Sequence, residues 1–132
     1  MVCMLDTNIC IYLIKGKPMH VVDKLRTFEP GDVAVSSITV AELHYGVSKS
    51  TQPDRNREAL AEFLLPLEVL PFDENASCHY GNIRSTLEKL GTVIGAMDLL
   101  IAAHARSLSL TLITNNLREF ERVPGLRTDN WA

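Results

Sequence analysis

The sequence of 132 residues predicts an α/β fold in which a short parallel β-sheet of four or five strands is flanked by helices. Four short apolar runs are near-continuous rather than alternating, as strands covered on both faces tend to be. The segments between these runs carry apolar residues at helical spacing, and strands that alternate with helices favour a parallel sheet. The chain contains no linker long enough to divide it, so residues 1–132 are expected to form a single domain.

The predicted strands are VCML (2–5), VAVS (33–36), EVLPF (68–72) and LTLIT (110–114). Helical spacing marks three segments between them, through Val22, Leu25 and Phe28, through Leu60, Phe63, Leu64 and Leu67, and through Ala76, Tyr80, Ile83, Leu87 and Leu90. Pro18 and Pro53 stand where the first two of these helices would begin, and Gly91 can end the third. The segment DLLIAAHA (98–105) is apolar on nearly every face, which predicts a buried helix.

Composition limits the classes of function. The formal net charge is −3, so no overall basic field indicates a nucleic-acid partner, although a local basic patch can serve the same purpose. The three cysteines form no C-x-x-C pair, which suits a reducing cytosol better than a secreted disulfide scaffold. The N-terminus does not resemble a signal peptide, and no apolar run approaches the ~20 residues that span a bilayer. We therefore expect a cytoplasmic protein with no membrane partner.

Polar residues follow three of the predicted strands at their carboxyl ends, which meet at one edge of a parallel sheet. Asp6 follows the first strand, Glu42 lies within two turns of the end of the second, and Asn116 and Glu119 follow the last. Each has an ordinary structural interpretation. Asp6 can cap the next helix, TVAE (39–42) fits a capping box, and Asn116 and Glu119 can be capping or surface residues.

Asp98 is harder to explain structurally, because it opens the apolar helix and shares a face with Ile101 and Ala102. A carboxylate that faces inward needs a partner, a shifted pKa or a metal ion. Several carboxylates at one edge, with no obvious fixed cation beside them, repel one another unless a positive charge lies among them. Such oxygen ligands favour Mg²⁺ or Mn²⁺, and the spacing of cysteine and histidine residues gives no competing zinc site.

The blocks MLDTNICIYLIK, SSITVAELHYG, IGAMDLLIAAHARS and LITNNLREFERVPGLRTDNW resemble, in order and spacing, the motifs of PIN-domain proteins. They most closely resemble the VapC toxins of bacterial VapBC toxin–antitoxin pairs, of the enterobacterial type. The resemblance runs from residue 4 to residue 131. It implies a PIN-like fold and a metal-dependent endoribonuclease.

Carried over by matching motif, the resemblance assigns Asp6, Glu42 and Asp98 to the metal-binding and catalytic cluster. Many family members have a fourth acid where this chain has Asn116. Its amide oxygen is a candidate fourth ligand or a second-sphere group, and Glu119, about one turn on, is the other candidate for the catalytic site. The implied cofactor is Mg²⁺, with Mn²⁺ as a substitute, and the implied reaction is attack of metal-activated water on a phosphodiester. Candidate contacts to the RNA backbone are Lys15, Lys17, Arg84 and Arg118.

The resemblance also implies partners. These are a VapB-type antitoxin whose C-terminal tail covers the site, a second copy of the chain in a homodimer, a larger hetero-oligomer with the antitoxin, and operator DNA reached only through the antitoxin. The implied substrate is tRNA, with the anticodon loop of initiator tRNA as a hypothesis. Single-stranded loops are where proteins usually read RNA sequence.

Four other functions compete. A dehalogenase-like phosphatase needs D-x-D, but position 8 is Asn8, and a receiver domain lacks its phosphoacceptor Asp and late Lys. The histidines, at positions 20, 44, 79 and 104, show no spacing suited to a metal-free, two-histidine ribonuclease. A PIN fold that serves only as a protein-binding module is the fourth, and Asn116 is the one residue that favours it. The intact acids Asp6, Glu42 and Asp98 oppose it.

Overall fold

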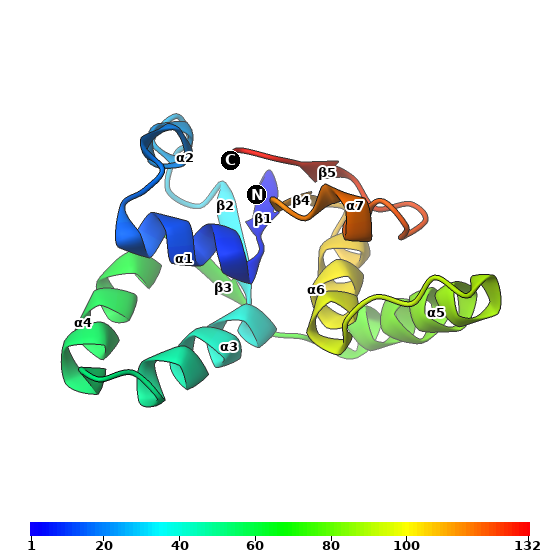
Figure 1. The fold of residues 1–132 in the computed structure, drawn as a ribbon. Coiled ribbons are helices and arrows are strands. Elements are labelled where there is room, and N and C mark those ends of the chain that lie inside the picture. The colour runs from blue at the N-terminus through cyan, green and yellow to red at the C-terminus, as the bar shows by residue number, and fades with distance from the viewer.

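The computed structural model describes residues 1–132, and its centre is a parallel sheet with the strand order β3-β2-β1-β4-β5. Figure 1 shows this sheet with helices on both sides. The strands are β1 (Cys3–Leu5), β2 (Val33–Ser36), β3 (Glu68–Leu70), β4 (Thr111–Ile113) and β5 (Thr128–Asp129). Every neighbouring pair is parallel, so the predicted α/β class and parallel sheet are confirmed.

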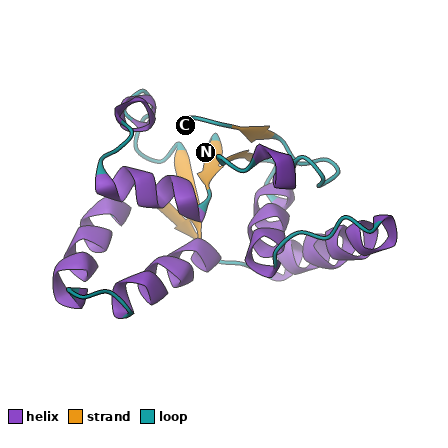
Figure 2. Ribbon diagram, viewed as in Figure 1, coloured by secondary structure: helices purple, strands orange, loops and turns teal.

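Seven helices connect the strands, and Figure 2 shows them as the larger part of the molecule. They are α1 (Thr7–Lys15), α2 (Met19–Leu25), α3 (Ser37–Ser48), α4 (Pro53–Leu64), α5 (Glu74–Leu90), α6 (Ala96–Ser107) and α7 (Leu117–Phe120). Pro18 immediately precedes α2 and Pro53 opens α4, as predicted. Gly91 ends α5 with φ of 70°, a left-handed conformation that favours glycine.

Two apolar patterns continued beyond the helices that they marked. Phe28 and Leu67 lie after the ends of α2 and α4, although both still pack against the core. Phe28 stacks on Trp131 with 5.3 Å between the ring centroids. These side chains are therefore apolar because loops also cover the core, and helical spacing alone overestimated the length of both helices.

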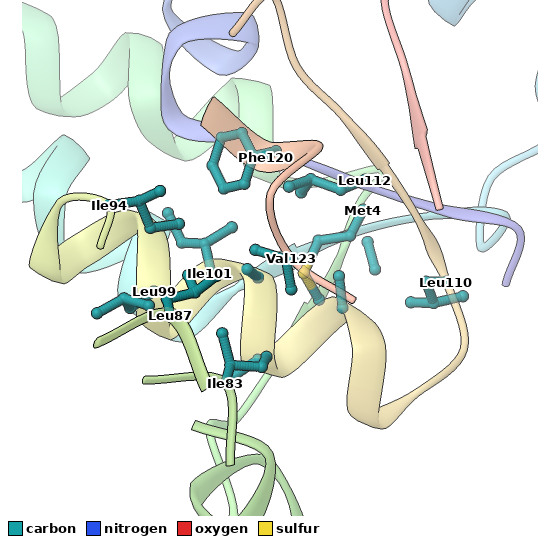
Figure 3. Packing of buried hydrophobic residues seen from close by; sticks show 14 residues of the cluster. Met4, Ile83, Leu87, Ile94, Leu99, Ile101, Leu110, Leu112, Phe120 and Val123 are labelled. Atoms are coloured by element: carbon teal, nitrogen blue, oxygen red, sulfur yellow. The ribbon is translucent and has the colours of Figure 1, made fainter. Parts of the chain in front are cut away.

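The core is divided by the sheet into two clusters, because successive strand residues point to opposite faces. Cys3 and Leu5 of β1 pack with α1, α3 and α4, whereas Met4 packs with α5 and α6. Figure 3 shows the second cluster, in which Met4 and Leu112 face Ile101 of α6 and Phe120 of α7. The predicted burial of the segment 98–105 is confirmed, since Leu99 and all residues from Ile101 to Ala105 are buried.

The third predicted strand differs from the expectation. It was predicted over 68–72 as a strand covered on both faces, but β3 covers only Glu68–Leu70, and Glu68 and Val69 are exposed. The reason is its place at one edge of the sheet, beside β2 alone. The opposite edge is β5, a two-residue strand that the apolar pattern did not mark individually.

The strand order sets the location of the site. From β1 the chain adds β2 and β3 on one side and later returns to add β4 and β5 on the other. In open parallel sheets, ligands bind at the carboxyl ends of the strands where the order reverses in this way. Asp6 follows β1 and Thr114 follows β4 at that point. None of the seven helices combines the length and the apolar character that a membrane-spanning segment requires.

Candidate active site

Asp6 lies between β1 and α1 and is only 4% exposed. It is the N-cap of α1, and its Oδ1 accepts a hydrogen bond of 2.9 Å from the Ile9 N–H. The predicted capping role is therefore confirmed. Burial nevertheless raises the pKa of Asp6, with a smaller contribution from the charge of Glu42, while hydrogen bonds from Thr114 and Ile9 oppose the rise. Asp6 is thus a fixed carboxylate whose negative charge is costly in the metal-free protein.

Glu42 belongs to the second turn of α3 and points toward α1. The Thr7 hydroxyl donates a 2.7 Å hydrogen bond to Glu42 Oε1. The capping-box interpretation of TVAE (39–42) is wrong, because the N-cap is Ser36, whose Oγ accepts from the Ile38 N–H. Glu42 has no capping function, and its position beside Asp6 needs another explanation.

Asp98 stands in the first turn of α6, half-buried, and meets Glu119 from α7. Burial is the largest cause that raises the pKa of Asp98 to about 7, followed by the charge of Glu119 and a hydrogen bond to it. The charges of Asp6 and Glu42 raise it further. Four carboxylates from four segments of the chain are therefore electrostatically coupled at this edge of the sheet.

Glu119 is held by two donors. Its Oε1 accepts a 2.8 Å hydrogen bond from the Gly95 N–H, and its Oε2 accepts one of 2.6 Å from Asn116 Nδ2. The Gly95 bond is the largest cause that places the pKa of Glu119 below its ordinary value, and Asn116, Asp98 and the charge of Arg122 add to it. The surroundings therefore favour the protonated form of Asp98 and the ionised form of Glu119.

The donor set fits a hard divalent cation. The three ion pairs of the molecule, Arg26–Asp23, Arg57–Asp54 and Arg84–Glu88, include none of these four acids. No three histidine, cysteine or acidic side chains converge closely enough to hold an ion directly. Mg²⁺ usually keeps several water ligands and takes one or two carboxylates. The arrangement therefore suits an ion bound partly through water, rather than one enclosed by protein atoms.

A groove of about 250 Å³ lies between α1, α3 and α4, and Glu42 is one of its lining residues. Six of its ten lining residues are hydrophobic, among them Ile11, Ile14 and Leu60. Lys15 also lines it, so one of the four predicted RNA contacts lies beside an acid of the site.

The other three predicted RNA contacts are placed differently. Lys17 is exposed in the loop between α1 and α2, and Arg118 is exposed in α7, next to Glu119. Arg84 lies on α5, where its guanidinium bonds Tyr80 and Glu88 on the same helix. No contact joins Arg84 to the acids, so this residue has the weakest structural support of the four.

Several residues of the site were not recognised as such in the sequence. Thr7 orients Glu42, and Thr114 bonds Asp6 and also accepts from the Asn116 N–H at 2.9 Å. Both threonines adjoin the ends of predicted strands, which is the signal that could have identified them. The role of the Gly95 N–H could not be recognised in the sequence, because a backbone donor does not depend on the residue type.

Comparison with known proteins identifies the family of this chain. A family model described as "PIN domain" matches residues 3–126. Ribonuclease VapC2 of Haemophilus influenzae is 51% identical over 98% of this chain and 97% of its own. The tRNA(fMet)-specific endonuclease VapC of Salmonella typhimurium is 47% identical with the same coverage. In the crystal structure of DNA-bound VapBC from Salmonella typhimurium, the matching chain is 46% identical, with a TM-score of 0.94 and all of both chains covered.

The sheet order and the family match define the class, and the chain belongs to the PIN-domain family. Identity of 47–51% to two VapC proteins over nearly their full lengths places it in the VapC branch of that family. The resemblance stated from the sequence motifs is thereby confirmed.

Proposed function

We propose that this chain is the toxin of a type II toxin–antitoxin system and acts as a metal-dependent endoribonuclease on tRNA. The electrostatic coupling of Asp6, Glu42, Asp98 and Glu119 at the sheet edge, with no ion-pair partner, is the observation that carries the proposal. The two VapC relatives described above support it, since one is named a ribonuclease and the other a tRNA(fMet)-specific endonuclease. The anticodon loop of initiator tRNA is accordingly the first substrate to test.

Asp6 and Asp98 are the proposed ligands of Mg²⁺, for which Mn²⁺ is the expected substitute, and Glu42 contacts the ion directly or through water. When bound, such an ion polarises the phosphodiester and lowers the pKa of an attacking water. Thr7 and Thr114 fix the Glu42 and Asp6 carboxylates before substrate arrives. Glu119, which contacts Asp98, and Asn116, which donates a hydrogen bond to Glu119, are the proposed outer-sphere groups.

The raised pKa of Asp98 has a consequence for metal binding. Carboxylate ligands bind metal ions in their deprotonated form, so at a pH below about 7 ion binding must release a proton from Asp98. The Gly95 N–H and the Asn116 amide keep Glu119 ionised beside Asp98. Repulsion between the two carboxylates, once both are ionised, is what a divalent cation relieves.

The groove beside Glu42 is the proposed seat of a VapB-type antitoxin. The solved relatives include VapBC complexes, some of them bound to DNA. An apolar segment of the antitoxin fits the hydrophobic lining, and a basic side chain from it can reach Glu42, the acid that lines the groove. Homodimerisation, a larger hetero-oligomer with the antitoxin, and DNA contact through the antitoxin complete the proposal.

The activity is tested by incubating the purified protein with initiator tRNA and Mg²⁺, with and without excess EDTA. Wild-type protein should cleave only when the metal is available. Asp6→Asn and Asp98→Asn should lose at least about 100-fold in rate, as is usual when a group that stabilises the transition state is removed. Glu62→Gln, which neutralises an exposed acid on α4, is the matched control and should retain activity.

Two outcomes would contradict the proposal. Cleavage that survives both EDTA and Asp98→Asn would rule out the metal mechanism. If no RNA is cut with any divalent ion while a co-expressed antitoxin still binds, the chain is a protein-binding module instead.

A further inference from the structure

Tyr45 stands apart from the other aromatic residues of the molecule. It is 67% exposed, whereas every phenylalanine and the tryptophan are buried or half-buried. The remaining tyrosines, Tyr12 and Tyr80, are half-buried, and their hydroxyls take part in hydrogen bonds with Asn115 and Arg84. Tyr45 therefore adds little to the core and leaves its ring available at the surface.

Tyr45 lies on the same face of α3 as Glu42, one of the acids of the candidate active site. It follows Glu42 by three residues on α3, and Lys49 follows Glu42 by seven, so all three lie on one stripe of the helix. At 1.5 Å per residue, Tyr45 is about 4.5 Å and Lys49 about 10.5 Å along the axis from Glu42. The stripe thus leads outward from the acidic cluster.

Lys49 supplies a charge at the same place. Its Nζ lies over the Tyr45 ring, 4.8 Å from the centroid, so the ammonium covers one face of the ring, and the lysine makes no ion pair with any acid. An exposed aromatic ring with a cation at one face is a combination that can hold single-stranded nucleic acid, because a base can stack on the other face of the ring while its phosphate contacts the cation. The net charge of −3 gives no general attraction for RNA, so local elements of this kind are needed.

The stripe is also separate from the groove. Tyr45 and Lys49 are not among the residues that line it, whereas the neighbouring Gly46 and Val47 are. Helix periodicity places the ring and the groove on opposite sides of Glu42. A substrate that contacts Tyr45 consequently uses a surface that the proposed antitoxin segment does not.

We propose that Tyr45 and Lys49 form a binding subsite for the RNA substrate, in which a nucleobase next to the cleaved bond stacks on the Tyr45 ring and the adjoining phosphate contacts the Lys49 ammonium. The proposal deepens the ribonuclease function and rests on it for the identity of the ligand. Tyr45 and Lys49 contribute affinity and position along the strand, while the acids carry out the reaction.

Binding is measured separately from cleavage, by fluorescence anisotropy of a labelled single-stranded RNA of about ten nucleotides. The parent protein carries Asp98→Asn, so that the probe is not cut. Tyr45→Ala should raise the Kd for the RNA by roughly 5- to 100-fold, which is the effect of losing one base stack. Tyr45→Phe retains the ring and should bind within about twofold of the parent.

The lysine is tested by salt dependence. Loss of one phosphate contact lowers the slope of log K against log salt by about 0.7 for a single strand. Lys49→Gln should show this change, and Lys24→Gln, an exposed lysine on α2, should not. Unfolding temperatures of all variants should equal that of the parent, because each substituted side chain is exposed.

Failure of the two proposals can be distinguished. If the wild-type protein cuts no RNA, the ribonuclease proposal fails, whatever the anisotropy shows. If Tyr45→Ala and Lys49→Gln bind the RNA like the parent, the subsite is wrong even in an active enzyme. Unchanged RNA binding with a changed oligomeric state, or with loss of a co-expressed antitoxin, would assign Tyr45 to a protein interface and would also overturn the subsite.

Discussion

At the scale of single residues, the pKa values of Asp98 and Glu119 are shifted in opposite directions, although the two side chains are in contact. Burial and three nearby carboxylates favour the protonated form of Asp98, while backbone and amide donors favour the ionised form of Glu119. The surroundings thus shift the pKa values of the two carboxyl groups in opposite directions. Such separation of neighbouring pKa values is typical of functional sites, and it costs stability when no cation is bound.

This cost predicts that Asp98→Asn stabilises the metal-free protein against unfolding, and that the gain in stability depends on pH. The pKa of Asp98 is about 7 in the folded protein and 3.8 for an unperturbed aspartate, so its contribution to stability is fully present below pH 4 and is lost as the pH rises through 7. Because the side chain is half-exposed, solvent screening reduces the effect, and we expect the variant to gain about 1–2 kcal/mol relative to wild type between pH 5 and pH 8.

Urea unfolding with EDTA at both pH values measures this difference. Glu62→Gln is the control, because that acid is exposed on α4 and should give the same small effect at each pH. If the free energies of unfolding of Asp98→Asn and wild type differ by the same amount at both pH values, the neighbours of Asp98 do not raise its pKa.

Asn116 predicts a second change at the residue scale. Its Nδ2 donates to Glu119 Oε2 at 2.6 Å, so Asn116→Asp replaces this donor with a like charge. The metal-free variant should lose about 1–3 kcal/mol of stability through the lost hydrogen bond and the new repulsion. Its affinity for Mn²⁺ should rise, since a further carboxylate becomes available, and isothermal titration measures both affinity and stoichiometry.

The isosteric Asn115→Asp, one position earlier, is the comparison variant for Asn116→Asp. Asn115 bonds Tyr12 rather than Glu119, so its substitution should not raise affinity for Mn²⁺. If Asn116→Asp also leaves the affinity unchanged, Asn116 lies too far from the ion to act as a fourth ligand.

At the scale of elements, α3 and α6 carry Glu42 and Asp98, and a buried hydrogen bond joins them. His104 Nδ1 of α6 lies 2.7 Å from the Oγ of Ser36, the N-cap of α3, and both side chains are buried. Burial lowers the pKa of His104, which favours the neutral ring. The same serine thus starts one acid-bearing helix and ties it to the other.

Ser36→Ala should therefore lower the free energy of unfolding by about 2–4 kcal/mol. It removes a helix cap, worth about 1 kcal/mol, and leaves His104 without its buried partner, worth about 1–3 kcal/mol. Ser48→Ala, an exposed serine at the end of the same helix, should change stability by less than about 0.5 kcal/mol. Equal effects of the two substitutions in chemical denaturation would show that the Ser36–His104 bond contributes nothing.

The elements also show where sequence patterns succeed. The central strands and α6 were predicted correctly because burial on all sides leaves a continuous apolar run. The edge strand β3 was taken for a buried one, since an apolar run does not reveal what covers it. The capping box at 39–42 failed because Ser36, three residues earlier, caps α3 instead, and a local motif cannot show which of two polar residues begins a helix.

At the scale of the whole molecule, the site depends on topology that no local pattern contains. The carboxyl-end rule placed Asp6, Glu42 and Glu119 at one edge from sequence alone. The sequence did not predict the strand order that brings β1 and β4 side by side, nor the Gly95 N–H that fixes Glu119 from 24 residues away. Residue types could be recognised in advance, but their hydrogen-bond partners required the folded chain.

Because the acids come from segments distributed along the whole chain, ion binding should stabilise the entire fold. The unfolded chain lacks the assembled cluster, so Mg²⁺ at ten times its Kd adds about 1.4 kcal/mol, which corresponds to a rise of roughly 5 °C in Tm for a domain of this size. Asp6→Asn should abolish most of this rise, and Glu62→Gln should preserve it. Differential scanning calorimetry with Mg²⁺ or EDTA measures both. If Mg²⁺ raises the Tm of Asp6→Asn as much as that of wild type, the ion binds elsewhere and the acidic cluster is not its site.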